Sequence, residues 1–380
     1  MIHRRISNLL NKRHYGWAIF GLAFTNLTAE GGMKNSAPVV FLALRDHFGR
    51  SAAATAGIFS VAGLTGALIS PFLGKLLDRL GPRLLFPAGG LFILIGYLAS
   101  SLVSDFWQLI ILYGVVATIG ETTVSSFTAT ASLAPWFPHS RGRVLGLADA
   151  GNPLGQGMFT PLTQLLISAF GWRFAFRIIG PAFFLMVAPA NFLFQRRPPV
   201  PPSPTEETVE EASAALESSG SMQPADDSEA QFPERPVARA AIRKTSGQIQ
   251  EPLRSATLWC LVSARCLAAM GTNLTTIHMM AFFVAAGYSE LQAAYTIGAV
   301  GLLSLAGRPI AGAISDGVGR ELVYTVGLGM QVSAIVLILL SGDGQRLWPM
   351  ALFVGLSGLS DGISGLMVGA KAADVFPARS

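Results

Sequence analysis

The chain has 380 residues, of which 51% are hydrophobic and only 13% are charged. Charged residues make up about a quarter of ordinary soluble domains, so the composition excludes that class. Nearly half of the 22 acidic residues lie in one segment, 196–252, and the net charge of +5 is what basic loops beside a membrane would give. The charge therefore requires no nucleic-acid partner.

Residues 1–195 contain six apolar segments, and each is long enough to cross the roughly 30 Å hydrocarbon core of a bilayer as a helix. They are predicted as an N-terminal bundle of six helices. The basic N-terminus followed by a long apolar stretch indicates an uncleaved first helix rather than a signal peptide. The six predicted helices cover 15–44 (interrupted at Glu30–Gly32 and at Pro38), 52–77, 84–103, 107–136, 144–170 and 172–195.

Residues 196–252 are rich in Pro, Glu, Ser and Ala and have almost no large apolar side chains. Such a segment cannot bury a core, so we expect a disordered cytoplasmic linker. Residues 253–380 contain four more apolar segments and are predicted as a C-terminal bundle holding helices seven to ten. The sequence thus predicts an all-α membrane protein with about ten transmembrane helices, at 253–286, 290–314, 322–340 and 347–373 in this second half.

The second predicted helix and its charged exit recur 238 positions later without a gap. A repeated half of this kind is typical of secondary transporters. The identical pairs are Gly49/Gly287, Ser51/Ser289, Ala56/Ala294, Gly63/Gly301, Leu64/Leu302, Pro71/Pro309, Gly74/Gly312, Asp78/Asp316 and Gly81/Gly319.

The repeat also bears on topology and length. Lys and Arg concentrate in the segments that are cytoplasmic when the N-terminus is inside, which favours that orientation in a cell (inner) membrane. Phe376-Pro377 follows the tenth helix as Phe137-Pro138 follows the fourth. By symmetry, two further helices are expected after the tenth, so we expect the second bundle to be truncated.

The charged exit, GKLLDRLGPR, resembles the signature G-x-x-x-D-R-x-G-x-R between helices two and three of the major facilitator superfamily. The resemblance implies two pseudo-symmetric six-helix bundles and a loop that acts as a conformational latch. The alternative is a plain loop that stops membrane insertion. The matching residues are Gly74, Asp78, Arg79, Gly81 and Arg83, with Gly312, Asp316, Gly319 and Arg320 in the second copy.

Three further places resemble the monocarboxylate transporter and oxalate/formate antiporter branch of that superfamily. They are the glycine- and proline-containing fifth helix with Gly171-Trp172-Arg173 after it, the seventh helix around His278, and Arg308-Pro309 in the eighth. The resemblance implies a small organic anion as substrate. Ser304 stands where animal members of the branch often have an aspartate, so proton coupling through that aspartate is unavailable here.

Arg308, Lys34 and His278 are the candidate substrate-binding residues. An arginine within a membrane helix requires a partner or a cavity, and its planar fork suits a carboxylate. In the resembled branch, the corresponding arginine binds the substrate carboxylate, and a lysine like Lys34 serves protons and the anion. The alternatives are a cation near the membrane surface for Arg308, a snorkelling side chain for Lys34 and a helix-to-helix hydrogen bond for His278.

Glu121, Asp361 and Arg265 are the candidate coupling residues, because ionisable side chains inside membranes often relay protons. They can equally form structural charge pairs. Glycines four residues apart, such as Gly142/Gly146 and Gly151/Gly155, predict close helix packing.

We therefore expect a secondary transporter for a small organic anion such as a monocarboxylate, working by alternating access with protons or a counter-anion. The alternatives are an efflux transporter for uncharged or cationic compounds, and a sensor or inactive fragment. No sequence motif supports an enzyme, a metal site or a cofactor.

Overall fold

The computed structural model describes residues 15–137, 140–196, 255–340 and 346–375. The side chains of residues 257, 261, 309, 312, 313, 316 and 364–375 are outside this description. By their contacts, residues 1–197 and 261–380 form one unit, and residues 198–260 form another. Most of the predicted linker lies outside the described residues.

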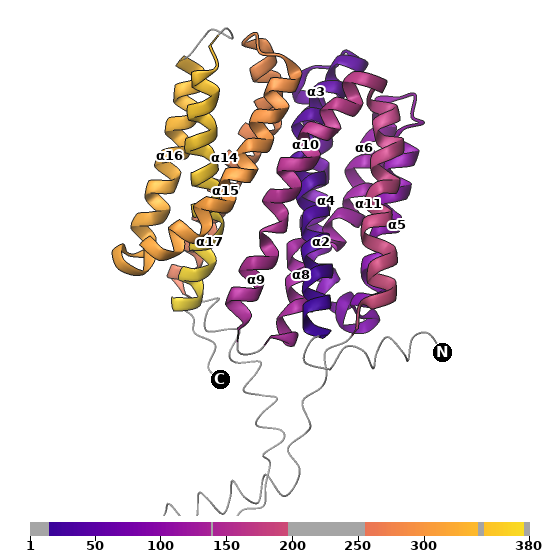
Figure 1. Ribbon diagram of the computed structural model, residues 1–380. Coiled ribbons are helices and arrows are strands. Elements are labelled where there is room, and N and C mark those ends of the chain that lie inside the picture. Colours follow the sequence, from indigo (N-terminus) through magenta and orange to yellow (C-terminus); the bar gives the residue numbers. More distant parts are fainter. Residues whose placement is uncertain (1–14, 138–139, 197–254, 341–345, 376–380) are drawn as a thin grey trace, which may run out of the picture. The chain divides into compact units, whose positions relative to one another are not determined.

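Every regular element in the described ranges is a helix, as predicted for an all-α protein (Figure 1). Six helical stretches are long and apolar enough to cross a membrane: Ala52–Leu80, Pro82–Ser100, Phe106–Trp136, Trp172–Phe194, Leu258–Ala285 and Arg320–Leu340. The elements are α2 (Tyr15–Asn35), α3 (Ala37–Phe48), α4 (Ala52–Leu80), α5 (Pro82–Ser100), α6 (Phe106–Ile111), η1 (Leu112–Ala117), α7 (Thr118–Thr123), α8 (Ser126–Leu133), η2 (Ala134–Trp136), α9 (Arg141–Asp149), α10 (Gly151–Phe170), α11 (Trp172–Phe194), α14 (Ala256–Ala285), α15 (Glu290–Val318), α16 (Arg320–Leu340) and α17 (Trp348–Val375).

The sequence repeat is also a structural repeat. Helices α4 and α15 both have 29 residues, and their bounds differ by the same 238 positions as the identical residues. Ser51 and Ser289 are the N-caps, and each accepts a backbone N–H bond of 3.2 Å from the third residue beyond it. Gly81 and Gly319 end the helices with positive φ angles of 75° and 96°. The repeated residues therefore mark where the two helices begin and end.

The charged exit is much shorter as a loop than the sequence predicted. Helix α4 continues through Leu80, and Gly81 alone separates it from α5, which begins at Pro82. The residues of the exit up to Leu80 form helix readily, whereas Gly81 adopts a backbone conformation that is strained for other residues. Proline then fits the first turn of the next helix because its missing N–H is not needed there. The loop expected between the predicted helices 52–77 and 84–103 is thus a single residue, Gly81.

The first helix is also interrupted at a different place from the predicted one. Gly31 and Gly32 are helical, and the break falls at Ser36, just before α3. A Cβ atom on Gly31 would lie 2.0 Å from the carbonyl oxygen of Asn152 in α10. The glycines therefore permit close packing of α2 against α10, and Pro38 lies in the first turn of α3.

The predicted helix 107–136 is divided into shorter pieces. Its second piece, η1, is π-helical, and a second break falls at Val124 and Ser125 between α7 and α8. This region packs closely against α5. A Cβ atom added to Gly120 would lie only 2.4 Å from the carbonyl oxygen of Gly89. The pieces place Glu121 on α7, packed beside α5.

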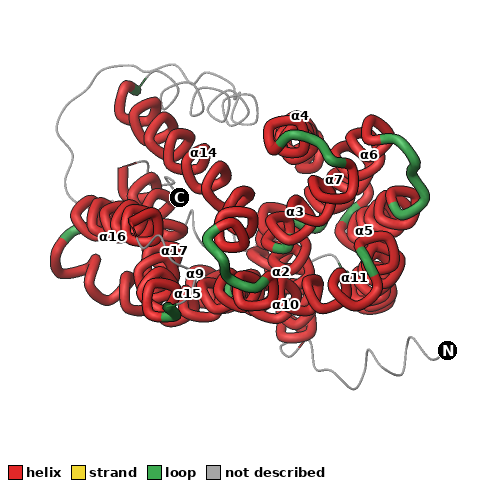
Figure 2. Tube along the Cα trace, turned by 90° about the horizontal axis from the view of Figure 1, so that it is seen from above, coloured by secondary structure: helices red, strands yellow, loops and turns green. Residues whose placement is uncertain are grey.

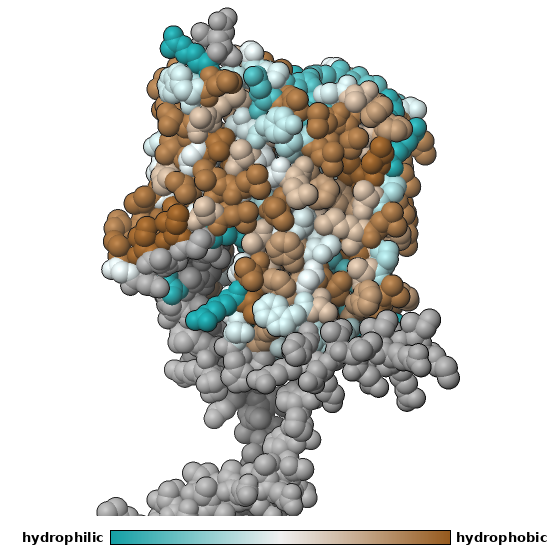
Figure 3. Space-filling model, viewed as in Figure 1, coloured by the Kyte–Doolittle hydropathy of each residue, from teal (hydrophilic) through white to brown (hydrophobic). Residues whose placement is uncertain are grey.

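Helices α2 and α10 lie side by side, as do α5 and α11, and α15 lies beside α10 and α17 (Figure 2). Within the described residues, the largest buried cluster combines aliphatic and aromatic side chains, among them Tyr97, Tyr113, Trp172 and Phe176. On the outer face, apolar side chains cover much of the described surface (Figure 3). Leu64, Leu68 and Phe72 of α4, for example, are each more than half exposed. Such a surface requires an apolar surrounding, as a lipid bilayer provides.

We predict that Gly81→Ala lowers the stability of the folded protein by about 1–3 kcal/mol, because alanine is strained at this backbone conformation. Gly74→Ala is the matched control, since a Cβ atom there meets nothing within 4 Å in the same helix. Thermal unfolding of the purified protein in detergent measures both changes. Equal melting temperatures for the two variants would contradict the prediction.

We also predict that Gly155→Ala destabilises the protein by about 1–3 kcal/mol through overpacking. Its Cβ atom would lie 2.0 Å from the carbonyl oxygen of Thr28, so α2 and α10 would have to separate. Gly146→Ala, in open space on α9, is the control and should leave the melting temperature unchanged or raise it. A Gly155→Ala protein as stable as this control would show that α2 and α10 do not pack closely.

Candidate functional site

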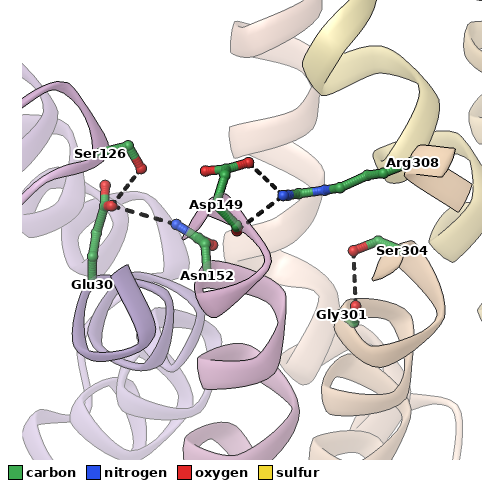
Figure 4. Close-up of polar contacts among 7 residues, drawn as sticks. All are labelled: Glu30, Ser126, Asp149, Asn152, Gly301, Ser304 and Arg308. Carbon is green, nitrogen blue, oxygen red and sulfur yellow. Dashed lines mark hydrogen bonds and ion pairs between the residues drawn. The ribbon is translucent and has the colours of Figure 1, made fainter. Parts of the chain in front are cut away.

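Arg308 of α15 is bound to the end of α9. Its Nη1 atom donates to the backbone carbonyl oxygen of Asp149 at 2.9 Å and forms an ion pair with Oδ2 of the same residue (Figure 4). The two side chains are 20% and 30% exposed. A single guanidinium nitrogen therefore joins a carboxylate and a helix C-terminus, both of which carry negative charge.

The surroundings of Arg308 bring a second acidic residue close. Gly307 of α15 and Gly362 of α17 approach so closely that a Cβ atom on Gly362 would lie 2.7 Å from the Cα atom of Gly307. Asp361 adjoins this crossing, and the charge of Arg308 acts on its carboxyl group. The hydroxyl of Ser304 is buried and donates to the carbonyl oxygen of Gly301, one turn from Arg308. Arg308 thus pairs with a carboxyl group from α9 and acts electrostatically on one from α17.

A second polar group lies around Glu30 of α2. The Ser126 hydroxyl donates to Glu30 Oε2 at 2.6 Å, and Asn152 Nδ2 approaches the same oxygen at 3.5 Å. Asn152 is three residues after Asp149, so it brings the Glu30 group next to the Arg308 ion pair (Figure 4). The charge of Asp149 also acts on Glu30.

Glu121 extends this group toward α5. Its Oε1 atom accepts a hydrogen bond of 3.0 Å from the Tyr97 hydroxyl. Lys34, in the last turn of α2, is exposed, and its charge acts on both Glu30 and Glu121. Carboxylates from α2 and α7 and an ammonium from α2 therefore share one polar region.

The other predicted binding and coupling residues lie apart from this region. The ring of His278 packs edge-on against Phe41, with the ring centroids 5.0 Å apart. Arg265 is exposed on α14, and no contact given for the described residues joins it to the groups above. The structure thus brings together Arg308, Asp361, Lys34 and Glu121 but leaves His278 and Arg265 outside.

The residues of the predicted latch lie at the α4–α5 turn and its copy. Asp78 and Arg79 are exposed, while Arg83 donates from Nε to the Phe192 carbonyl oxygen at 3.0 Å and lies over the Phe192 ring. In the second copy, Gly319 forms the turn and Arg320 begins α16. The side chains at positions 312 and 316 are outside the described residues.

Sequence reasoning missed Asp149, Ser126, Asn152 and Tyr97. Asp149 had a usable signal, because it is a carboxylate within the apolar run from Val144 to Phe170. The other three are neutral, and only the contacts of the folded chain reveal them as partners of acidic groups. Within the described residues, no cluster of His, Cys, Asp and Glu could hold a metal ion.

Residues 22–380 match the Major Facilitator Superfamily. The chain belongs to this superfamily. It is 32% identical to human Monocarboxylate transporter 11 over 193 residues, which are 50% of this chain and 41% of that protein. It is 26% identical to rat Monocarboxylate transporter 3 over 358 residues, or 93% of this chain and 66% of that protein. The chain therefore spans less than two thirds of the length of these curated relatives.

Solved structures of superfamily transporters show the same fold. A bacterial homolog of the human lysosomal transporter Spinster matches with a TM-score of 0.66 at 15% identity, over 96% of this chain and 76% of that one. A D-xylose-proton symporter matches with a TM-score of 0.61 at 17% identity, over 96% and 84%. This member of the Major Facilitator Superfamily is thus an all-α, multi-pass membrane protein, and its relatives are transporters rather than enzymes.

We predict that Tyr97→Phe lowers stability by about 1–3 kcal/mol, because it leaves the Glu121 carboxyl group without its phenolic donor. Tyr295→Phe is the control, since Tyr295 is 53% exposed. Thermal unfolding in detergent compares the two variants. Adding Glu121→Leu to Tyr97→Phe removes the carboxyl group that lost its donor, so part of the stability should return. If the double variant is as unstable as Tyr97→Phe alone, the lost Tyr97–Glu121 hydrogen bond is not the cause of the instability.

Proposed function

We propose that this protein is a secondary transporter for a small organic anion of the monocarboxylate class, working by alternating access. The observation that carries the proposal is the ion pair of Arg308 with the Asp149 carboxylate. A guanidinium that already binds one carboxylate inside a membrane helix has the donors and the charge to bind another. The likeness to monocarboxylate transporters supports the same substrate class.

The energetic argument concerns the cost of a buried cation. An arginine at the centre of a membrane helix costs about 2.5–3.5 kcal/mol when it has no compensating partner. Asp149 offsets that cost in the structure, and a substrate carboxylate offers the same compensation. Arg308 therefore needs an anion in every state in which it is away from water. We assign the substrate carboxylate to Arg308, with Lys34 as a second cation from the first helix.

Coupling is assigned to the acidic groups that share this region. Position 304 is a serine, and its hydroxyl donates to a backbone carbonyl. It therefore cannot carry a proton for transport as an aspartate at this position would. In proton-coupled transport, Glu30, Glu121 and Asp361 remain as proton acceptors. In anion exchange, a counter-anion would bind Arg308 at the same site. Rocking of the two halves against each other would alternate access. The setting we propose is the cell membrane, with a cytoplasmic N-terminus and a cytoplasmic segment 196–252 between bundles 1–195 and 253–380.

A second candidate function is export of cationic or uncharged compounds. Four carboxyl groups, from Glu30, Glu121, Asp149 and Asp361, surround two cations, so the region suits a cation as well. Tetraphenylphosphonium export by cells that express the chain would favour this function, and lactate uptake would favour the first.

We predict that Arg308→Ala reduces the uptake of radiolabelled L-lactate, pyruvate or formate into proteoliposomes by about tenfold or more. Hydrogen bonds to charged groups contribute about 1.5–3 kcal/mol, and 1.4 kcal/mol corresponds to tenfold. Arg45→Ala, which removes a cation paired with its neighbour Asp46, is the control and should transport normally. Uptake by Arg308→Ala at the wild-type rate would overturn the proposed role of Arg308.

A further inference from the structure

Asp149 lies at a junction between two helices. It is the last residue of α9, and Ala150 separates it from Gly151, the first residue of α10. Both its side-chain carboxylate and its backbone carbonyl oxygen bind the same nitrogen of Arg308. Arg308 therefore contacts both the C-terminal end of α9 and the negatively charged side chain of Asp149.

The two helices at this junction are fixed in different ways. Helix α10 contacts α2 backbone to backbone, since Cβ atoms on Gly151 and Gly155 would lie 2.6 Å and 2.0 Å from carbonyl oxygens of α2. Helix α9 packs through Val144 and Ala148, but Gly142 and Gly146 have nothing within 4 Å of a built Cβ atom. The predicted close packing at Gly142/Gly146 is thus absent, whereas that at Gly151/Gly155 is confirmed. At these glycines, the α9 side of the junction is therefore less closely packed than the α10 side.

The Asp149 carboxylate is also open to exchange. It is 30% exposed and Arg308 is 20% exposed, so an anion from water can reach the pair. Asp361 from α17 and Glu30 from α2 act electrostatically on the two partners. Glu30 repels the Asp149 carboxylate, and the guanidinium of Arg308 keeps its positive charge whichever anion it binds. A soluble carboxylate has the same chemistry as the group it would replace.

We propose that Asp149 is a tethered carboxylate that occupies Arg308 in the absence of substrate and is displaced by the substrate carboxylate. The proposal rests on the function proposed above. Displacement of Asp149 releases the end of α9 from α15. Binding of the anion therefore also loosens this contact between the two repeats. Because Arg308 is available only in the fraction of molecules in which Asp149 has left, Asp149 lowers the apparent affinity for the anion.

The first test compares equilibrium binding of radiolabelled L-lactate, pyruvate and formate to the full chain in detergent. Asp149→Asn should lower the apparent Kd about fivefold, the scale expected when a partly exposed ion pair no longer competes. Asp149→Glu keeps the competing carboxylate and should stay within about twofold of wild type. Asp46→Asn is the matched control, because it removes the same charge at an exposed position and should change nothing.

The outcomes separate this inference from the proposed function. If Arg308→Ala abolishes binding and Asp149→Asn tightens it, both stand. If Arg308→Ala abolishes binding but Asp149→Asn leaves the apparent Kd unchanged or raises it, the competition is wrong and the proposed function stands. If wild type binds none of the three anions, or Arg308→Ala binds as wild type does, the proposed function fails.

A second test needs no ligand. Spin labels on Gly146→Cys in α9 and Ile314→Cys in α15, in a Cys260→Ser and Cys266→Ser background, report the distance between these helices. Gly146 lies in open space, and Ile314 is 49% exposed, so both accept a label. Asp149→Asn should broaden or lengthen the distance distribution, and Asp46→Asn should not. An unchanged distribution in Asp149→Asn would overturn the tether.

Discussion

Charge inside an apolar surrounding is the constraint on which this structure depends. A guanidinium in a membrane helix requires a negative partner, and here a carboxylate and a helix C-terminus supply it together. The same requirement explains the Glu30 group, which has a hydroxyl and an amide donor, and the Glu121 group, which has the Tyr97 hydroxyl. Satisfying these groups takes residues from α2, α5, α7, α8, α9, α10, α15 and α17. The polar interior therefore ties these helices together.

The sequence predicted the all-α class, the superfamily and the repeat, because each of them depends on patterns that can be read directly from the sequence. Apolar length predicts a helix, but the ends predicted at residues 77 and 314 fall short of Gly81 and Gly319, where α4 and α15 end. The interruptions were harder to place. Gly31 and Gly32 had two meanings, a helix break or a close helix crossing, and only the position of Asn152 on α10 decides between them. Likewise Gly142/Gly146 and Gly151/Gly155 have the same spacing but different neighbours.

The site was predictable in part for the same reason. Arg308, Lys34, Glu121 and Asp361 are charges within apolar runs, and such charges stand out in any sequence. Their partners do not, because Ser126, Asn152 and Tyr97 are ordinary polar residues until the fold places them beside a carboxyl group. His278 also stands out in the sequence, and in the structure its ring packs against the Phe41 ring.

The π-helical segment η1 determines where Glu121 points. Each residue of an α-helix turns the chain by about 100°, and a π-helical turn accommodates an additional residue. The piece beyond η1 is therefore rotated about its axis relative to the α-helix that precedes it. Glu121 faces Tyr97 because of that change of phase. A single-residue deletion between Leu112 and Ala117 would restore the regular phase and direct the carboxyl group away from its phenol while leaving every side chain of the site intact.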